Sequence, residues 1–200
     1  EQVGQNKADA TAAMVREVNP DAQVQVMPVF LRAEDAAPLV QQCDLVINMV
    51  DSGPALYALL RATREQGKVA LFPLNVGFGG VLLAFGPESP SLEDLVGPVT
   101  DADLFLGIVE RLAPSLPSYL MQFAWMAERI QRERLAPPQL GMAASITASL
   151  VVGSMVKVAL GLPPPFVPTI ITLDSREPSF LSWPIAQERS QTLEASHGDN

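Results

Sequence analysis

Residues 45–50 read LVINMV, a nearly continuous apolar run that ends directly before the carboxylate of Asp51. Such runs are typical of strands that are covered on both faces in a parallel sheet. Residues 54–65 then have the composition of a helix, which Gly67 ends. We therefore expect a buried strand with Asp51 at its carboxyl end, where doubly wound sheets place their ligands.

Helical and extended patterns alternate on both sides of this strand. Residues 7–18 have apolar side chains at helical spacing, and residues 35–42 fit a shorter helix. Residues 23–27 alternate polar and apolar side chains as a half-buried strand does, and further short strands are expected at residues 69–72 and 81–85. The alternation predicts an α/β fold, with a Rossmann-like, doubly wound and mainly parallel sheet that has antiparallel additions.

The second half of the chain is richer in helical patterns. Carboxylates occupy the first turn of a helix expected at residues 101–111, and residues 119–134 fit a longer helix with a bulky apolar face. Residues 140–160 fit a third helix, and residues 169–173 fit a last strand. The expected fold therefore ends in a group of C-terminal helices and one strand.

The extent of the domain follows from these patterns. We expect residues 1–186 to be the C-terminal part of one α/β domain, which includes the helical segment 99–136. Residues 187–200 are polar and are expected to be a disordered tail. The chain begins abruptly with the helix-forming residues 7–18, so we expect an N-terminal part of the domain to be missing from it.

The third helix contains the longest apolar run of the chain, residues 142–156, which Lys157 interrupts. A helix that spans a membrane needs about 20 apolar residues, so we expect a buried helix of a soluble protein. Its small side chains would permit close approach to another helix and hence a homodimer; they are Ala144, Ser145, Ala148, Ser149 and Gly153.

The composition excludes several classes of function. The net charge of −9 argues against nucleic acid and anionic membranes as partners, because both bind clustered Lys and Arg side chains. A single cysteine, Cys43, rules out an internal disulfide and a cysteine-rich zinc site. We interpret Cys43 as a small core residue, and we expect a cytoplasmic protein. The only histidine, His197, lies in the polar tail, so a Ser-His-Asp hydrolase is not supported.

Several segments, in this order and spacing, resemble the ThiF/MoeB/E1-like adenylyltransferase superfamily. The family has a VGxxKA segment before a helix and an NP end, a DLVxDxxD strand end, and a GKP segment before GFxGx(V/L). Its last helix closes with KxLxG. The matching stretches here are VGQNKA at residues 3–8 with VNP at 18–20, CDLVINMVDS at residues 43–52, GKV at 67–69 with GFGGV at 77–81, and VALG at residues 158–161.

The resemblance implies an enzyme that joins a carboxylate to AMP and releases pyrophosphate, with ATP and Mg²⁺ as cofactors. Lys7 matches the lysine that contacts the ATP phosphates, with Asn6 beside it, and Asp51 matches the aspartate that binds Mg²⁺. The partner would be the C-terminus of a ubiquitin-like carrier protein or a small carboxylate. The residues that would guide the acyl tail are Asn75, Gly77, Phe78 and Gly79.

Each of these residues also has a purely structural interpretation. Lys7 is equally a solvated surface lysine, and Asp51 is equally a turn residue or a helix N-cap. The glycines at residues 77–80 permit a bend between strands. The carboxylates of Glu93, Asp94, Asp101 and Asp103 are expected to be solvated charges rather than metal ligands.

The chain also departs from the family pattern. It contains no GxGGxG phosphate loop, no paired CxxC zinc ligands and no cysteine after the glycine-rich bend that could form a thioester. Asn48 stands where many members have an acidic residue. A second hypothesis is therefore a catalytically degenerate, E1-like binding or scaffold subunit. A third, an NAD-dependent Rossmann protein, lacks its fingerprint.

Overall fold

The computed structural model describes residues 2–51, 53–96, 125, 129, 132, 133, 135, 139–176 and 179–184. The chain divides into two compact units, Glu1–Arg32 and Ala33–Asn200, and each is described by itself. The helices expected at residues 101–111 and 119–134 lie outside the described residues, except for a few positions of the second. The tail expected at residues 187–200 also lies outside them.

The first unit contains one helix, α1 (Lys7–Val18), among its described residues. The side chain of Asn6 caps this helix by accepting a hydrogen bond from the backbone N–H of Ala8 at 2.9 Å. Near the other end of α1, Arg16 donates to the backbone carbonyl of Val24 at 2.8 Å and so ties the helix to the chain that follows. Helix α1 confirms the expectation for residues 7–18.

The strand expected at residues 23–27 is wrong, because the backbone there is irregular. The alternating pattern is nevertheless real: Val24 and Val26 are half-buried, whereas Gln23, Gln25 and Met27 are exposed. A strand needs a neighbour that satisfies its backbone groups, and the described part of this unit offers only a helix. The alternating pattern therefore reflects side chains that are partly buried on one face of this segment, and it does not indicate a paired strand.

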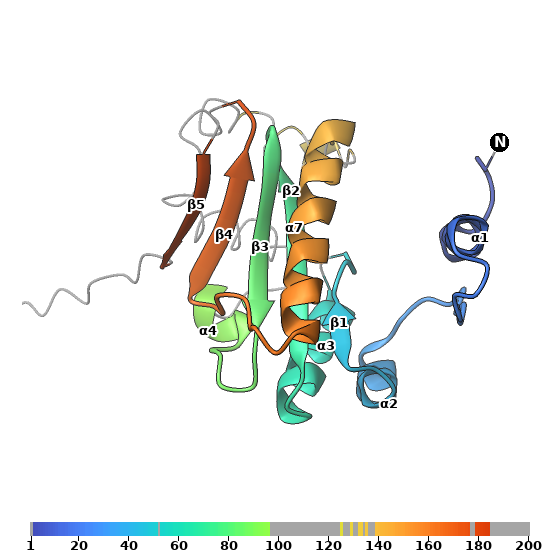
Figure 1. Ribbon diagram of the computed structural model, residues 1–200, viewed down its shortest axis with the longest axis horizontal. Helices are drawn as coiled ribbons and strands as arrows, with labels where there is room; N and C mark the ends of the chain where they lie inside the picture. The colour runs from blue at the N-terminus through green and yellow to red at the C-terminus, as the bar shows by residue number, and fades with distance from the viewer. Residues whose placement is uncertain are drawn as a thin grey trace, which may run out of the picture. The chain divides into compact units, whose positions relative to one another are not determined.

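The second unit is built on a sheet with the strand order β1-β2-β3-β4-β5 (Figure 1). The strands are β1 (Leu45–Ile47), β2 (Val69–Val76), β3 (Gly79–Phe85), β4 (Thr169–Asp174) and β5 (Ser179–Pro184). Strand β1 pairs with β2 in parallel, and the other neighbours pair antiparallel. The α/β class and the mixture of parallel and antiparallel strands are confirmed, and the parallel part of the described sheet is the β1–β2 pair.

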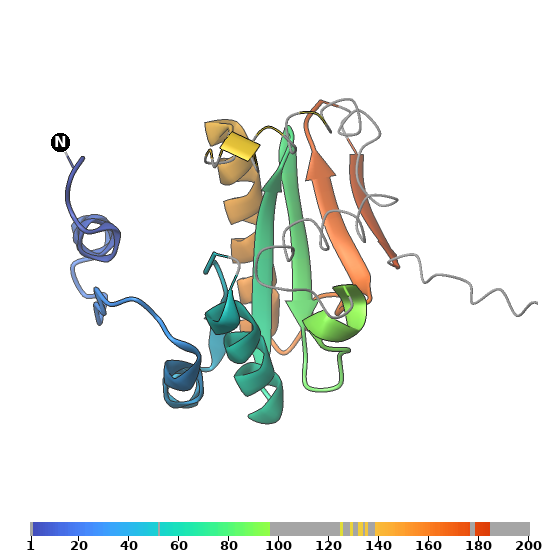
Figure 2. The same cartoon turned by 180° about the vertical axis from the view of Figure 1, so that it is seen from behind.

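Helices cover both faces of this sheet. A short 3₁₀ turn, η1 (Ala33–Asp35), leads into α2 (Ala36–Gln41). Helices α3 (Pro54–Glu65) and α4 (Leu92–Val96) lie on one face, and α7 (Gly141–Ala159) lies on the other (Figures 1 and 2). Strand β3 is consequently buried along its whole length.

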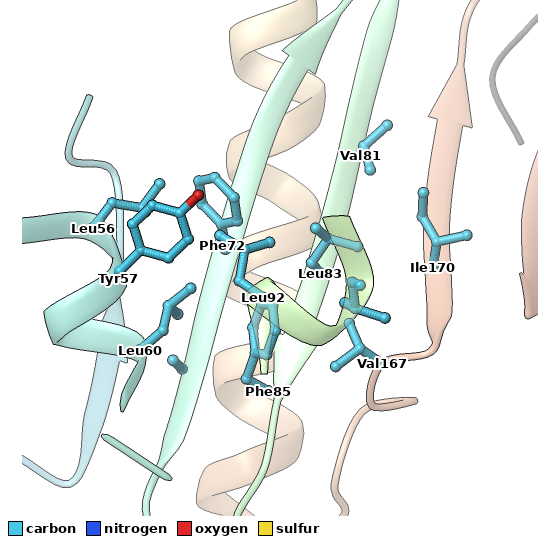
Figure 3. Close-up of a cluster of buried hydrophobic side chains, with 12 residues drawn as sticks. Leu56, Tyr57, Leu60, Phe72, Val81, Leu83, Phe85, Leu92, Val167 and Ile170 are labelled. Carbon is cyan, nitrogen blue, oxygen red and sulfur yellow. The ribbon is translucent and has the colours of Figure 1, made fainter. Parts of the chain in front are cut away.

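The two faces of the sheet carry separate apolar clusters. On the face of α3 and α4, side chains from both helices converge with those of β2, β3 and β4, including Leu56, Phe72, Leu83, Leu92 and Ile170 (Figure 3). On the other face, Leu71, Leu82 and Ala84 of the sheet pack with Val151 of α7 and Ile171 of β4. The strict alternation along β2 and β3 is the period of a strand with both faces covered.

Two glycines allow β3 to lie this close to its neighbours. A Cβ on Gly80 would collide with the Oγ1 of Thr147 and stand 2.9 Å from its Cβ, so α7 packs directly against bare backbone. A Cβ on Gly79 would collide with the carbonyl oxygen of Leu173 on β4. These glycines therefore serve close packing, whereas the bend itself is at Gly77, which has φ 57°.

Helix α7 is buried along one face only. Ala143, Thr147, Val151 and Ser154 face the sheet, whereas Val152 is 56% and Val156 is 53% exposed. The expectation of a buried helix is thus correct for one face and wrong for the other. Among the described residues, α7 is also the one helix that length and mean hydropathy (1.6) would allow to cross a membrane, although 22% of that stretch is buried in the protein.

Replacing Gly80 with alanine tests the close contact between α7 and β3. We expect Gly80→Ala to lower the free energy of unfolding by about 1–3 kcal/mol, because the new methyl group overpacks a full interior. Gly153→Ala is the matched control, since a Cβ there meets nothing within 4 Å. On an exposed helical position it should raise stability by about 0.5–1 kcal/mol. Urea unfolding of both variants measures the pair, and equal stability of Gly80→Ala and the wild type would contradict the packing.

Candidate functional site

The loop after β1 carries the predicted carboxylate. The backbone N–H of Asn48 donates to the carbonyl of Leu71 at 2.8 Å, which extends the parallel pairing with β2 by one residue beyond Ile47. The chain then leaves the sheet, and Asp51 is exposed. Among the described residues, no hydrogen bond or ion pair engages the carboxylate of Asp51. Asp51 is therefore an available anion four residues beyond the carboxyl end of a parallel strand. The strand itself is not buried as expected: Leu45 and Val46 are half-buried and Ile47 is 38% exposed, because β1 pairs only with β2 at the margin of the described sheet.

Asn48 is the buried polar residue of this loop. Its side chain is fully buried, its Nδ2 donates to the carbonyl of Leu56 in the first turn of α3 at 3.1 Å, and its Oδ1 accepts from the N–H of Val50 at 3.3 Å. In the sequence, Asn48 stood out only as a departure from a family pattern. An amide inside an apolar run was the signal, because buried polar side chains are held by hydrogen bonds.

The residues considered for an acyl tail lie at the turn between β2 and β3. Strands β1 and β2 run parallel, but β2 continues for five residues beyond Leu71, the partner of Ile47, so this turn lies farther along the sheet than the end of β1. Asn75 donates to the side chain of Gln139 at 3.0 Å, and the carbonyl of Phe78 accepts from the N–H and the hydroxyl of Ser175 at 3.3 and 2.7 Å. With Gly77 and Gly79, these residues form a fixed turn, and their role toward a substrate stays a prediction.

Asn6 and Lys7 belong to the first unit, and Asp51 belongs to the second. Lys7 is the first residue of α1 and is exposed, and among the described residues its ammonium makes no hydrogen bond or ion pair. Together with Asn6, it lines an open hollow of about 750 Å³ between α1 and residues 24–30. Most residues that line the hollow are apolar, among them Ala12, Val15 and Val26, and Lys7 is the cation in its lining.

Lys68 shows what a structural lysine looks like in this chain. Its ammonium donates to the carbonyls of Val40 and Gln41 at 2.6 and 3.1 Å, and so satisfies the C-terminal end of α2. Cations stabilise this end of a helix, where carbonyl groups lack partners within the helix. Lys68 is therefore committed to the fold, in contrast to Lys7.

A second hollow, of about 490 Å³, lies where α3 faces the start of α4. Arg61 pairs with Glu93 at 3.5 Å, although Oε2 of Glu93 is buried without a hydrogen-bond partner among the described residues. Asp94 accepts from the N–H of Ser91 at 2.8 Å, and its own N–H donates to the Ser91 hydroxyl. Hydrogen bonds from the side chain and the backbone N–H of Ser91 hold the pKa of Asp94 below its usual value, with Arg64 contributing.

The described residues suit a metal ion that is shared with a bound ligand, and they do not suit an ion held by protein side chains alone. Within the part of the chain that the structure describes, no group of three or more His, Cys, Asp or Glu side chains could hold an ion by itself. Mg²⁺ commonly uses one or two carboxylates together with substrate phosphates and water. Asp51 alone therefore suits an ion shared with a nucleotide and does not suit an ion held by protein ligands only.

The contrast between Lys68 and Lys7 can be measured as stability. We expect Lys68→Met to lower the free energy of unfolding by about 1–2 kcal/mol, because it removes charged hydrogen bonds at the end of α2. Lys7→Met should stay within about 0.5 kcal/mol of the wild type, since that side chain is exposed and unengaged. Thermal unfolding of the two variants compares them, and equal losses would show that Lys68 is as free as Lys7.

Comparison with known proteins relates the sequence of this chain to one family. The profile of the ThiF family matches residues 1–194. A sulfur carrier protein adenylyltransferase from Thermus thermophilus is 31% identical over 98 residues, which is 49% of this chain and 35% of that protein. The crystal structure of PaaA has a TM-score of 0.61 at 15% identity, covering 92% of this chain and 49% of that one.

A further similar structure is MccB from E. coli, determined with AMPCPP and MccA. It has a TM-score of 0.59 at 12% identity and covers 92% of this chain and 49% of that one. At such identities the likeness to PaaA and MccB concerns the fold alone. The chain spans about a third to a half of the length of these relatives.

Proposed function

Since the chain belongs to the ThiF family, we propose that it is part of an ATP-dependent adenylyltransferase that activates a carboxylate as an acyl adenylate. One observation carries the proposal most: Asp51 is an exposed carboxylate without a partner among the described residues, beyond the carboxyl end of a parallel strand. A carboxylate kept only for the fold would be expected to cap or pair, as Asp94 does.

The chemistry assigns separate tasks to the two charged residues. Lys7 would place a compact positive charge against the triphosphate, and its partner-free ammonium supports this role. Asp51 would hold Mg²⁺, which, when bound, neutralises charge that develops on the phosphates as pyrophosphate leaves. The substrate carboxylate would attack the α-phosphorus, forming the acyl–phosphate bond while the bond to pyrophosphate breaks. Asn6, next to Lys7, would help to hold the nucleotide.

The substrate that we propose is the C-terminal carboxylate of a small carrier protein or peptide. A relative is named as acting on a sulfur carrier protein, and MccB was determined with MccA. The turn between β2 and β3, with Asn75, Gly77, Phe78 and Gly79, follows the strand that pairs in parallel with β1 and is where an extended tail would pass. A small acid remains the other form of this substrate class.

This chain's cysteine favours direct transfer of the adenylate. Cys43 is half-buried before β1 rather than a core residue, and its Sγ donates to the carbonyl of Val40 at 3.4 Å, so its thiol is only partly accessible. A thioester requires an accessible thiolate. We therefore propose that the acyl adenylate is passed to an acceptor without a thioester on this chain, and that the protein works in the reducing cytoplasm.

The alternative, a degenerate binding or scaffold subunit, loses part of its support. It rested on Asn48, which stands where many members have an acidic residue, and on the missing cysteine. The hydrogen bonds of Asn48 to Val50 and Leu56 give this amide a structural reason that does not require loss of activity. The alternative is tested by the same measurement as the enzyme.

Replacing Asp51 tests the enzyme directly in the protein that contains this chain. We expect Asp51→Asn to abolish ATP–pyrophosphate exchange, at least 100-fold below the wild type, because the amide has no charge to hold Mg²⁺. Asp44→Asn is the matched control: Asp44 is exposed at the other end of β1 and should keep full activity. Unchanged exchange in Asp51→Asn would remove Asp51 from the mechanism, and an inactive wild type would favour the scaffold.

We also propose that the protein is a homodimer that uses the exposed face of α7. The exposed residues Ser145, Ala148, Ser149, Val152 and Val156 are uncharged, and the exposed charge of α7 is Lys157 in its last turn. A face without acidic side chains is where two copies of a chain with net charge −9 approach with least repulsion.

A charge on this face tests the dimer. We expect Val152→Glu to raise the dimer dissociation constant about tenfold or more, because it buries an unpaired carboxylate. Val18→Glu, at a position 87% exposed on α1, should leave the constant unchanged. Sedimentation equilibrium measures both, and a monomeric wild type would reject the dimer.

A further inference from the structure

Asn48 connects three parts of the second unit. Its backbone N–H is bonded to β2 through Leu71, its Nδ2 to the first turn of α3 through Leu56, and its Oδ1 to the loop through Val50. The side chain is fully buried, so water does not compete for these bonds. Sheet, helix and loop are thus fastened at a single residue, three positions before Asp51.

An amide can make both side-chain bonds, whereas an ionised carboxylate cannot. Asparagine offers an N–H donor and a carbonyl acceptor at the same branch point, whereas an ionised aspartate offers acceptors only. An aspartate here would keep the bond from Val50 and would point an oxygen at the carbonyl of Leu56. The bond to Val50 closes a short turn of the kind that Asn side chains form with the backbone two residues on.

The helix that follows depends on the same contact. Helix α3 begins at Pro54 after Gly53, which has no side chain that could cap it. The hydrogen bond from Asn48 to Leu56 ties the first turn of α3 to the end of β1. Asp51 lies three residues after Asn48 and makes no bond of its own among the described residues.

We propose that Asn48 is a positioning residue that fixes the loop carrying Asp51, so that the carboxylate meets its Mg²⁺ and nucleotide without prior ordering. The proposal rests on the proposed function for what Asp51 does, but the anchoring itself does not. Residues that orient a metal ligand typically change metal affinity or activity 10–100-fold when they are replaced.

The test uses Asn48→Leu, which keeps most of the buried volume and removes both side-chain bonds. Asn48→Ala is a second variant, used in case the leucine side chain of Asn48→Leu overpacks the interior and prevents folding. The matched control is Thr63→Val: Thr63 is also fully buried, and its hydroxyl donates to the carbonyl of Leu59 in α3 at 2.6 Å, but it lies away from the loop. All variants can lose stability, so stability alone decides nothing.

The first readout is amide hydrogen exchange, followed by mass spectrometry, without nucleotide. We expect peptides covering residues 48–53 to exchange roughly fivefold faster in Asn48→Leu, because a hydrogen bond worth about 1 kcal/mol is lost. Thr63→Val should leave these peptides unchanged. Equal exchange in Asn48→Leu and Thr63→Val overturns the anchoring, whatever the activity.

The second readout is the Mg²⁺ concentration that half-saturates ATP–pyrophosphate exchange. We expect it to rise about tenfold in Asn48→Leu, with the maximal rate largely recovered at high Mg²⁺, and to stay unchanged in Thr63→Val. A faster loop with an unchanged Mg²⁺ requirement overturns the link to Asp51. A wild type without exchange activity but with a slower loop than Asn48→Leu supports the anchoring and rejects the proposed function.

Discussion

The structure of the second unit depends on the close contact between Gly80 of β3, which has no side chain, and Thr147 of α7. Because no Cβ intervenes, α7 lies directly on the sheet, and Leu82 and Ala84 pack beneath it. On the other face, Val81, Leu83 and Phe85 pack under α3 and α4 (Figure 3). A strand buried on both faces must be in register with its neighbours, since a shift of one residue would exchange the two sets of side chains.

The parallel pairing of β1 with β2 sets where the chemistry is proposed. Asp51 follows the carboxyl end of β1, where doubly wound sheets place their ligands, and β2 continues five residues farther to its turn into β3. That turn is held by Ser175. The ammonium of Lys7, in the first unit, makes no hydrogen bond or ion pair among the described residues, whereas that of Lys68 is bonded to the end of α2. An enzyme that binds phosphate needs charged side chains that are not already bonded within the fold.

The sequence predicted most of the second unit because its patterns are strong. Residues 45–50 indicated a buried strand followed by Asp51, but the strand is only Leu45–Ile47 and is partly buried, because it pairs with β2 alone and Asn48 turns its side chain to α3 and the loop. The strand predicted at residues 23–27 was wrong, because period-two alternation shows only which side chains are buried on one face. Whether a segment pairs as a strand depends on a second strand beside it. Periodicity could not foresee that α7 leaves Val152 and Val156 exposed, because a uniformly apolar helix has no face that its pattern marks as outer.

The central claim is that the loop of residues 48–53 faces the phosphates of a bound nucleotide. The most direct measurement is hydrogen exchange of this loop in the protein that contains this chain, with Mg²⁺ alone, with a non-hydrolysable ATP analogue alone, and with both. The account predicts clear protection only when both are present, because the ion is held by Asp51 together with the phosphates. Equal exchange in all three conditions, at saturating nucleotide, would contradict it.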